Sequence, residues 1–549
     1  MANGTNEQPA KKRVVIIGGG LAGMVAAKEL AKRDYRVVIL EAGRELGGKA
    51  RAPRMSELYP EDSPQDERRI DHGYHVFPMW YRNTRALLAE LGIAERLIPI
   101  RQFHFLRKGE FPSFVTTYEV SSVKNLLHNL FHGIVPWTEN LLSFFYLLDL
   151  SCETFTDKGY LDRVSGVGFL RSRFYATESI ANLHQQTVLQ ASAIPYYECS
   201  AMTLQKLFRA WMRHPSPLYS ILDGNLTDRF IEPFRTHLEA LGVEIRLSTK
   251  VDGLLFATED GSVGGLYMDA GTPDDLNNLM EDTVVLATPH DIALRLLSGA
   301  EEIWFMDQVD ALRQEESDAD GHPEEGFGLL NMVHLTSAPM AAFHARFTER
   351  IPGLPKEHVN LVGSRFGLSI LDVAPHWGLE GTALDVISSH FEPLRHYAPE
   401  IATSYVWREL IEYVPALRGK SFTAWQTHVE EPLFLNTVGA WRHRPVARTG
   451  IPNLFMAGDY CRTDADLTTM ESAVLSGLNA AQAILARDGK TPDVAPLPLE
   501  TPPLWLLVLG KYLALPIVAP IGIWKRLQSR LRRRRRARAA RQPSAARQA

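Results

Sequence analysis

A glycine-rich turn between a buried strand and a helix is the strongest constraint in this chain. The continuous β-branched run Val14–Ile17 predicts a short buried strand. Gly18, Gly20 and Gly23 follow with the spacing G-x-G-x-x-G, and Ala22–Arg33 has the composition of a helix. Such glycines permit a tight turn, close approach of a pyrophosphate and close packing of helix on strand. The helix N-terminus adds N–H groups and a positive dipole end. We therefore predict a dinucleotide site at this turn.

A second strand extends this unit. Arg36–Glu41 is again apolar and β-branched, so the order strand, turn, helix, strand predicts a βαβ unit with parallel strands. Glu41 stands 18 residues after Gly23, where an acidic side chain can accept hydrogen bonds from ribose hydroxyls. The fingerprint alone leaves both FAD and NAD open.

The residues that follow favour FAD. The segment Arg44-Glu45-Leu46-Gly47-Gly48-Lys49 resembles the R-x-G-G-R/K signature of the amine oxidase and phytoene desaturase superfamily of flavoproteins. The resemblance implies that Gly47 and Gly48 approach the cofactor's pyrophosphate and that Lys49 occupies the second basic position. Arg44 would then clamp a phosphate or the ribose.

The C-terminal half supplies a matching set of motifs. Asn453–Tyr460 is an apolar strand that ends in Gly458 and Asp459, and in the superfamily this Asp contacts the ribityl chain of the flavin. The next helix begins at Met470 and Glu471, and its N-terminus would face the flavin ring and stabilise negative charge on the reduced flavin.

Two further strands resemble superfamily segments. Leu247–Val251 is similar to a T-x-V strand, in which the backbone of Val251 would meet the adenine. Asp282–Pro289 is similar to the strand that closes the FAD domain, and Arg444-Pro445 precedes the last strand as it does in this superfamily. Cys152, Cys199 and Cys461 do not lie in a flavin-attachment motif, so we expect the FAD to be non-covalent.

Two segments indicate a branch of the superfamily. Gly73–Asn83 is similar to the G-x-H-x-F-x-x-x-Y-x-N segment of plant-type phytoene and ζ-carotene desaturases and of hydroxysqualene dehydroxylases, with Pro78 where the family has glycine. His75 and Tyr81 are the catalytic candidates that this resemblance supplies. Leu222–Arg229 is similar to an L-D-G-N-x-x-x-R segment, in which Arg229 is linked to a quinone pocket. The alternative for Arg229 is a surface or structural arginine.

A chain of 549 residues is too long for one hydrophobic core, so we expect more than one domain. The fold class should be α/β: a discontinuous, doubly wound Rossmann-type FAD domain, a mixed α+β substrate domain and a C-terminal membrane-associating helix. The predicted boundaries are 13–74, 241–289 and 451–487 for the FAD domain, 75–240 and 290–450 for the substrate domain, 488–503 for a Pro-rich linker and 504–549 for the anchor.

The C-terminal segment combines an apolar run with a basic one. Leu504–Trp524 is mostly apolar, and the residues from Lys525 onward include eleven basic residues and no acid. The run could span a bilayer, but a cytosolic body would then place the positive charge outside, against the usual bias. We therefore predict an in-plane or re-entrant anchor on the cytoplasmic face of an anionic membrane. Nucleic acid would explain the charge but not the apolar run. The Leu- and Phe-rich residues 121–155 are either core or a second lipid contact.

Other chemistries lack a signal in the sequence. The three cysteines form no C-x-x-C pair, and the zinc-protease, P-loop and G-x-S-x-G patterns are missing, so we predict no metal site. The resemblance implies an FAD-dependent desaturase that oxidises a long isoprenoid lipid, such as a carotenoid or squalene-type precursor, with a membrane quinone or dioxygen as electron acceptor. One alternative is amine oxidation, with Trp441 and Tyr460 as an aromatic cage. The other is a non-redox polyene isomerase or dehydroxylase.

Overall fold

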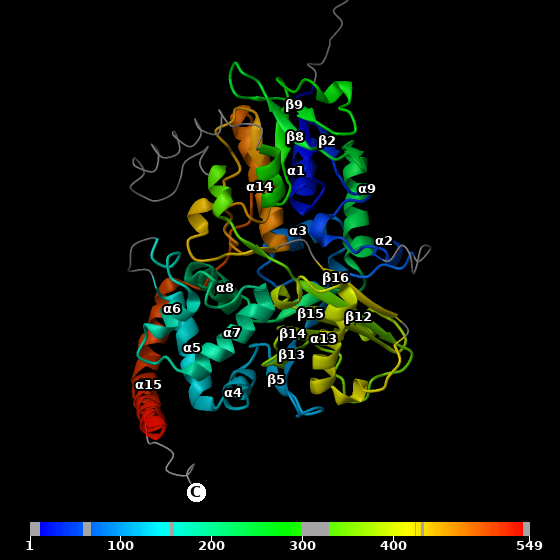
Figure 1. The fold of residues 1–549 in the computed structure, drawn as a ribbon. Coiled ribbons are helices and arrows are strands. Elements are labelled where there is room, and N and C mark those ends of the chain that lie inside the picture. Colours follow the sequence, from blue (N-terminus) through cyan, green and yellow to red (C-terminus); the bar gives the residue numbers. More distant parts are fainter. Residues whose placement is uncertain are drawn as a thin grey trace, which may run out of the picture.

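The computed structural model describes residues 11–58, 67–153, 159–297, 329–422, 424–429 and 433–541. Figure 1 shows a parallel-sheet region with α1 and α14, a helical region that contains α5 to α8, and a region built on a second sheet with α13. Helix α15 runs along the outside of the helical region. The chain passes repeatedly between these regions.

The first sheet is parallel throughout, with strand order β18-β10-β1-β2-β7. Its strands alternate between two hydrophobic cores, because Val14 and Ile16 belong to one core and Val15 and Ile17 to the other. Burial on both faces explains why these strands are continuously apolar in the sequence. The strands are β1 (Arg13–Ile17), β2 (Arg36–Leu40), β7 (Glu244–Arg246), β10 (Thr283–Leu286) and β18 (Leu454–Met456).

Helices cover one face of this sheet, and a hairpin with a helix covers the other. The helices are α1 (Leu21–Ala31), α3 (Arg82–Glu90), α9 (Glu232–Ala240) and α14 (Met470–Arg487). The opposite face carries β8 (Gly253–Phe256), β9 (Val263–Tyr267) and α10 (His290–Leu297). The predicted α/β class with a Rossmann-type sheet is confirmed. Helices α3 and α9 pack on this sheet although they lie within the range 75–240.

A seven-stranded mixed sheet forms the second region, in the order β16-β12-β15-β14-β13-β4-β5. Helix α13 (Pro399–Tyr413) packs on it through a shared apolar core. Its strands are β4 (Gln102–Arg107), β5 (Val115–Tyr118), β12 (Ala341–Phe347), β13 (Val359–Val362), β14 (Leu368–Asp372), β15 (Thr382–Ser388) and β16 (Ala424–Val429). Two short antiparallel pairs join β3 (Leu97–Ile100) to β6 (Tyr219–Leu222) and β11 (Ser337–Ala338) to β17 (Leu433–Phe434).

The Leu- and Phe-rich stretch forms two helices with different environments. Helix α5 (Trp137–Ser151) buries Leu142, Phe145 and Tyr146 in a core that it shares with α6 (Gly166–Arg171), α7 (Glu178–Ser192) and α8 (Ala201–Arg213). Helix α4 (Val123–Phe131) instead exposes several of its apolar side chains, namely Val123, Leu126, Leu127 and Phe131. The core alternative therefore holds for α5, and a lipid contact of α4 stays a prediction.

Helix α15 (Leu504–Arg541) is long and packs along α5. Lys511 Nζ lies 2.6 Å from Asp149 Oδ1, and Lys525 Nζ lies 3.2 Å from Glu139 Oε1, so both lysines of its apolar half face α5. Leu504–Ser529 is long and apolar enough to cross a membrane, and 17% of its most apolar window is buried in the fold. The side chains from Arg532 onward and all of 542–549 lie outside the described residues, and with them the predicted headgroup contacts.

The Pro-rich segment 488–503 forms neither helix nor strand, but it is held against α3. Leu497 N donates to Asn83 Oδ1 at 2.7 Å, Arg82 Nη1 donates to the Pro498 carbonyl at 2.8 Å, and Val494 is buried. These contacts attach the segment firmly to the parallel-sheet region.

Candidate active site

A cleft of about 520 Å³ opens at the carboxyl ends of the parallel strands. Ligands of open α/β sheets bind at this edge. Both sheets contribute to the cleft, since Ile387 on β15 lines it together with the glycine turn that follows β1. Of the residues selected from the sequence, the cleft is lined by Gly18, Gly20, Glu41, Gly47, Gly48, Lys49, His75, Tyr81, Val251, Gly458, Asp459 and Met470.

The glycine turn fits a pyrophosphate. A Cβ atom added to Gly20 would meet no atom within 4 Å, so the backbone there faces open space. Gly20 is also the N-cap of α1, and no side chain caps the helix there. Gly47 and Gly48 lie beside this turn, because Gly47 N donates to the Gly19 carbonyl at 2.8 Å. Gly23 does not line the cleft: a Cβ there would come within 2.1 Å of the Gly18 carbonyl oxygen, which makes it a packing residue.

Two charged residues from the same segment take different positions. Glu41 lines the cleft, and its carboxylate accepts from Gly19 N and Gly43 N, both at 2.7 Å. It therefore orders the glycine turn as well as facing the cofactor site. Arg44 is exposed and is not among the residues that line the cleft, so the structure does not support its role as a clamp.

The opposite end of the cleft is formed by the residues after β18 and by the start of α14. Gly458, Asp459 and Met470 line it, and Gly458 N donates to Ser476 Oγ at 2.9 Å. Glu471 lies elsewhere. Its buried carboxylate accepts from the backbone N–H groups of Asn83 and Thr84, at 2.9 and 2.8 Å, and thereby binds the start of α3. Burial raises the pKa of Glu471.

A buried arginine supports the turn that contains Asp459. Arg444 Nε donates to the Tyr460 carbonyl at 2.7 Å, and Nη2 donates to the carbonyls of Cys461 and Asp459 at 2.6 and 3.1 Å. Its Nη1 forms an ion pair with the buried Asp466. Sequence analysis noted Arg444 before the last strand but gave it no role, because its partners become neighbours only in the fold.

The loop before α3 brings two imidazoles and a phenol into the cleft. The rings of His72 and His75 lie 4.6 Å apart, edge to face, and both line the cleft with Tyr81. His75 Nδ1 donates to the Gly73 carbonyl at 2.9 Å, since a carbonyl can only accept. Gly73 has a φ of 122°, a backbone conformation that only glycine adopts readily. Sequence analysis missed His72, which directly precedes the motif that it examined.

Three further predicted residues lie outside the cleft. The Arg229 side chain is 40% exposed, its Nε lies 3.2 Å from Asp223 Oδ1, and its contact with a quinone stays a prediction. Neither Trp441 nor Tyr460 is among the lining residues, which removes the proposed aromatic cage. All three cysteines are described and buried, none is among the lining residues, and non-covalent binding of FAD stays a prediction.

A further part of the cleft lining comes from residues that no motif indicated. It includes Gln190, Ala193, Met340, Ile387, Ser389 and Leu433. These residues come from a loop, α7, the seven-stranded sheet and β17, and most of them are apolar. Among the described residues, no group of three or more His, Cys, Asp or Glu side chains is arranged to hold a metal ion.

Comparisons with known proteins agree with this geometry. Residues 21–485 match the family of flavin containing amine oxidoreductases. The chain is 24% identical to a zeta-carotene desaturase of Synechocystis over 87% of this chain and 98% of the relative. It is also 24% identical to the 15-cis-phytoene desaturase of Arabidopsis thaliana, over 87% and 81%. The solved structure of cyclohexylamine oxidase from Brevibacterium oxydans shares the fold, with a TM-score of 0.58, 15% identity, and coverage of 87% and 100%. The chain therefore belongs to the flavin containing amine oxidoreductase family and is an FAD-dependent oxidoreductase.

Proposed function

We propose that this chain desaturates a long-chain isoprenoid lipid, such as a carotenoid or a squalene-type precursor, at a membrane surface. The observation that carries the proposal is the apolar part of the wall of the cleft. Val76, Met340, Ile387 and Leu433 make this wall largely apolar, which suits a hydrocarbon chain. The names of the desaturase relatives point to the same substrate class.

Bound FAD supplies the two-electron oxidation by accepting a hydride. The chain's own residues bind the cofactor and orient the substrate. The glycine turns hold the pyrophosphate, Asp459 receives the ribityl chain, and Val251 meets the adenine. The N-terminus of α14 at Met470 stabilises negative charge on the cofactor. His75 and Tyr81 face the reacting carbons, and the apolar wall excludes water. Trp441 and Tyr460, the residues named for an aromatic cage, do not line the cleft, which gives amine oxidation less support.

We further propose that α15 lies in the plane of the membrane on its cytoplasmic face. Lys511 and Lys525 of this helix form ion pairs with acids of α5. The helical region therefore packs against α15 between these two lysines. The outer face is almost wholly apolar and includes Trp505, Leu509, Leu513, Ile517, Trp524 and Leu527. Such a helix suits the lipid interface, and the basic tail adds ~1 kcal/mol per residue near anionic headgroups. A membrane quinone would then be within reach as the acceptor, with dioxygen as the alternative.

Anaerobic titration of the holoprotein tests the substrate class. We would mix it with liposomes that contain phytoene or ζ-carotene, follow the flavin absorbance, and separate the products by chromatography. Cyclohexylamine and putrescine serve as amine controls. We expect bleaching and a more unsaturated product with a polyene only. Bleaching by an amine alone would overturn the proposal, and a polyene product formed without bleaching would favour the non-redox isomerase or dehydroxylase.

A further inference from the structure

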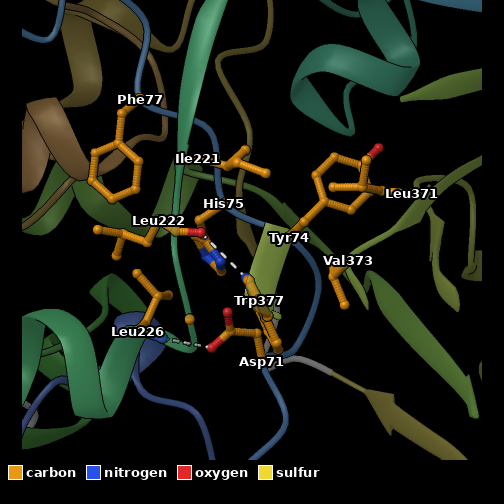
Figure 2. Close-up of a pocket in the computed structure, with 11 residues that line it drawn as sticks. Asp71, Tyr74, His75, Phe77, Ile221, Leu222, Leu226, Leu371, Val373 and Trp377 are labelled. Atoms are coloured by element: carbon orange, nitrogen blue, oxygen red, sulfur yellow. Dashed lines mark hydrogen bonds between the residues drawn. The ribbon is translucent and has the colours of Figure 1, made fainter. Parts of the chain in front are cut away.

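The loop 71–75 separates the cleft from a second, much smaller cavity. This cavity has a volume of about 10 Å³, close to the space that one water molecule occupies. Tyr74 and His75 line both spaces, so the loop forms a shared wall. Figure 2 shows the small cavity, whose other walls are mostly apolar: Phe77, Ile221, Leu222, Leu226, Leu371, Val373 and Trp377.

A buried carboxylate lines the small cavity. Asp71 is only 3% exposed, and its Oδ1 accepts from Leu226 N at 2.9 Å. Within the described chain, no residue donates to Oδ2, which Figure 2 shows on the side of His75 and Trp377. The indole of Trp377 is not its partner, because Nε1 donates to the Leu222 carbonyl at 3.2 Å. Asp71 therefore has one oxygen that can take a proton, and the His75 ring lines both this cavity and the cleft.

A second acid lies behind the same loop. Asp385 on β15 is buried, accepts from Tyr74 N, and has His344 Nδ1 3.4 Å from its Oδ1. Burial raises the pKa of both acids, that of Asp71 to about 7, and the charge of Asp71 raises the pKa of Asp385 further. Asp228 is the charged group that raises the pKa of Asp71. Burial and the repulsion of nearby acids therefore favour a proton on Asp71 and Asp385.

We propose that Asp71 and His75 together accept the proton that the desaturation releases. Asp71 lies on the opposite side of the loop from the substrate, and His75 lines both sides. The inference rests on the proposed function. One substrate carbon loses a hydride, which the flavin takes up with two electrons. The neighbouring carbon loses a proton to the Asp71–His75 pair, and the electrons of that C–H bond form the new C=C bond. The pair then releases the proton to solvent. In the neutral ring the accepting nitrogen is Nε2, since Nδ1 donates to Gly73.

Infrared spectroscopy of the oxidised holoprotein tests the proton site without any substrate. We would record the carboxylic-acid carbonyl band between about pH 5 and pH 9, in light and heavy water, for the parent, Asp71→Asn and Asp228→Asn. Asp228 is a matched control, because it is a nearby acid whose side chain is half exposed. We expect a band that titrates near neutral pH in the parent and in Asp228→Asn and is missing in Asp71→Asn. A parent without such a titrating band would overturn the proposal, even if the Asp71→Asn variant failed to fold.

Rapid anaerobic mixing with ζ-carotene liposomes tests the role in the reaction. Asp71→Asn should slow flavin reduction on the order of 100-fold, the lower range for loss of a positioned proton acceptor. Reoxidation of the flavin by dioxygen should match the parent, which a general structural defect would not allow. An unchanged reduction rate would overturn the proposal. If ζ-carotene and phytoene fail to reduce even the parent flavin while the infrared band titrates, the desaturase function is wrong and the proton site stands.

Discussion

Replacing Arg444 by methionine should separate the support of the cofactor turn from the cofactor contacts themselves. The side chain is fully buried and does not line the cleft, so the substitution removes no direct contact with FAD. It removes three hydrogen bonds to main-chain carbonyls of residues 459–461 and leaves Asp466 without its arginine. Methionine is similar in length and uncharged, so it fills much of the same space.

The expected loss of stability follows from these contacts. Removing one partner of a buried ion pair costs about 3–5 kcal/mol, because the other charge stays buried. Asp466 keeps Lys206 Nζ at 3.5 Å, Asn436 Nδ2 at 3.2 Å and Thr203 Oγ1 at 3.3 Å, which places the cost at about 3 kcal/mol. Domains are commonly stable by about 5–15 kcal/mol, so the variant should fold. We expect most of the FAD to be lost on gel filtration, since the turn at Asp459 is no longer held.

Urea unfolding followed by tryptophan fluorescence measures the change in stability, and flavin absorbance measures the cofactor. Arg395→Met is the matched control, because Arg395 is half exposed and pairs with Glu392 at 3.6 Å, so it should lose at most about 1 kcal/mol. Adding Asp466→Asn to Arg444→Met should restore part of the lost stability by removing the buried charge that has lost its arginine. An Arg444→Met protein that unfolds at the parent's urea concentration and retains its FAD would refute this reasoning.

Three other perturbations have defined outcomes. Gly20→Val should fold with near-parental circular dichroism but bind no FAD, since its side chain enters open space; Gly23→Val should misfold, because its Cβ would collide with the Gly18 carbonyl oxygen. Asp71→Asn should flatten the dependence of melting temperature on pH. The raised pKa of Asp71 stabilises the parent fully below about pH 4, and this contribution is lost as the pH rises towards 7, so the variant should gain up to ~4 kcal/mol relative to the parent by pH 8. Equal melting curves at pH 5 and pH 8 would exclude this. Deletion of residues 504–549 should abolish flotation with anionic vesicles while FAD remains bound; persistent flotation would point to the exposed apolar side chains of α4.

The cofactor motifs could be predicted from the sequence because they act largely through their own backbone. Gly18, Gly20, Gly47 and Gly48 permit conformations and close approaches that side chains would block, and these are local properties. The strands and helices around them follow from short-range patterns, so the parallel sheet and its class could be predicted as well. The apolar run from Leu504 likewise indicated a long helix whose outer face is apolar.

Side-chain direction was decided by the tertiary structure. Glu471 lies in the first turn of the expected helix. Its carboxylate binds the backbone N–H groups at the start of α3 and does not point into the cleft. Arg229 lies in the expected segment, yet its nearest acid is at the surface. Arg444 and Asp71 gain their significance from backbone groups and cavities that distant segments create. The apolar wall exists only where the second sheet meets the first, because no single stretch of chain contains it.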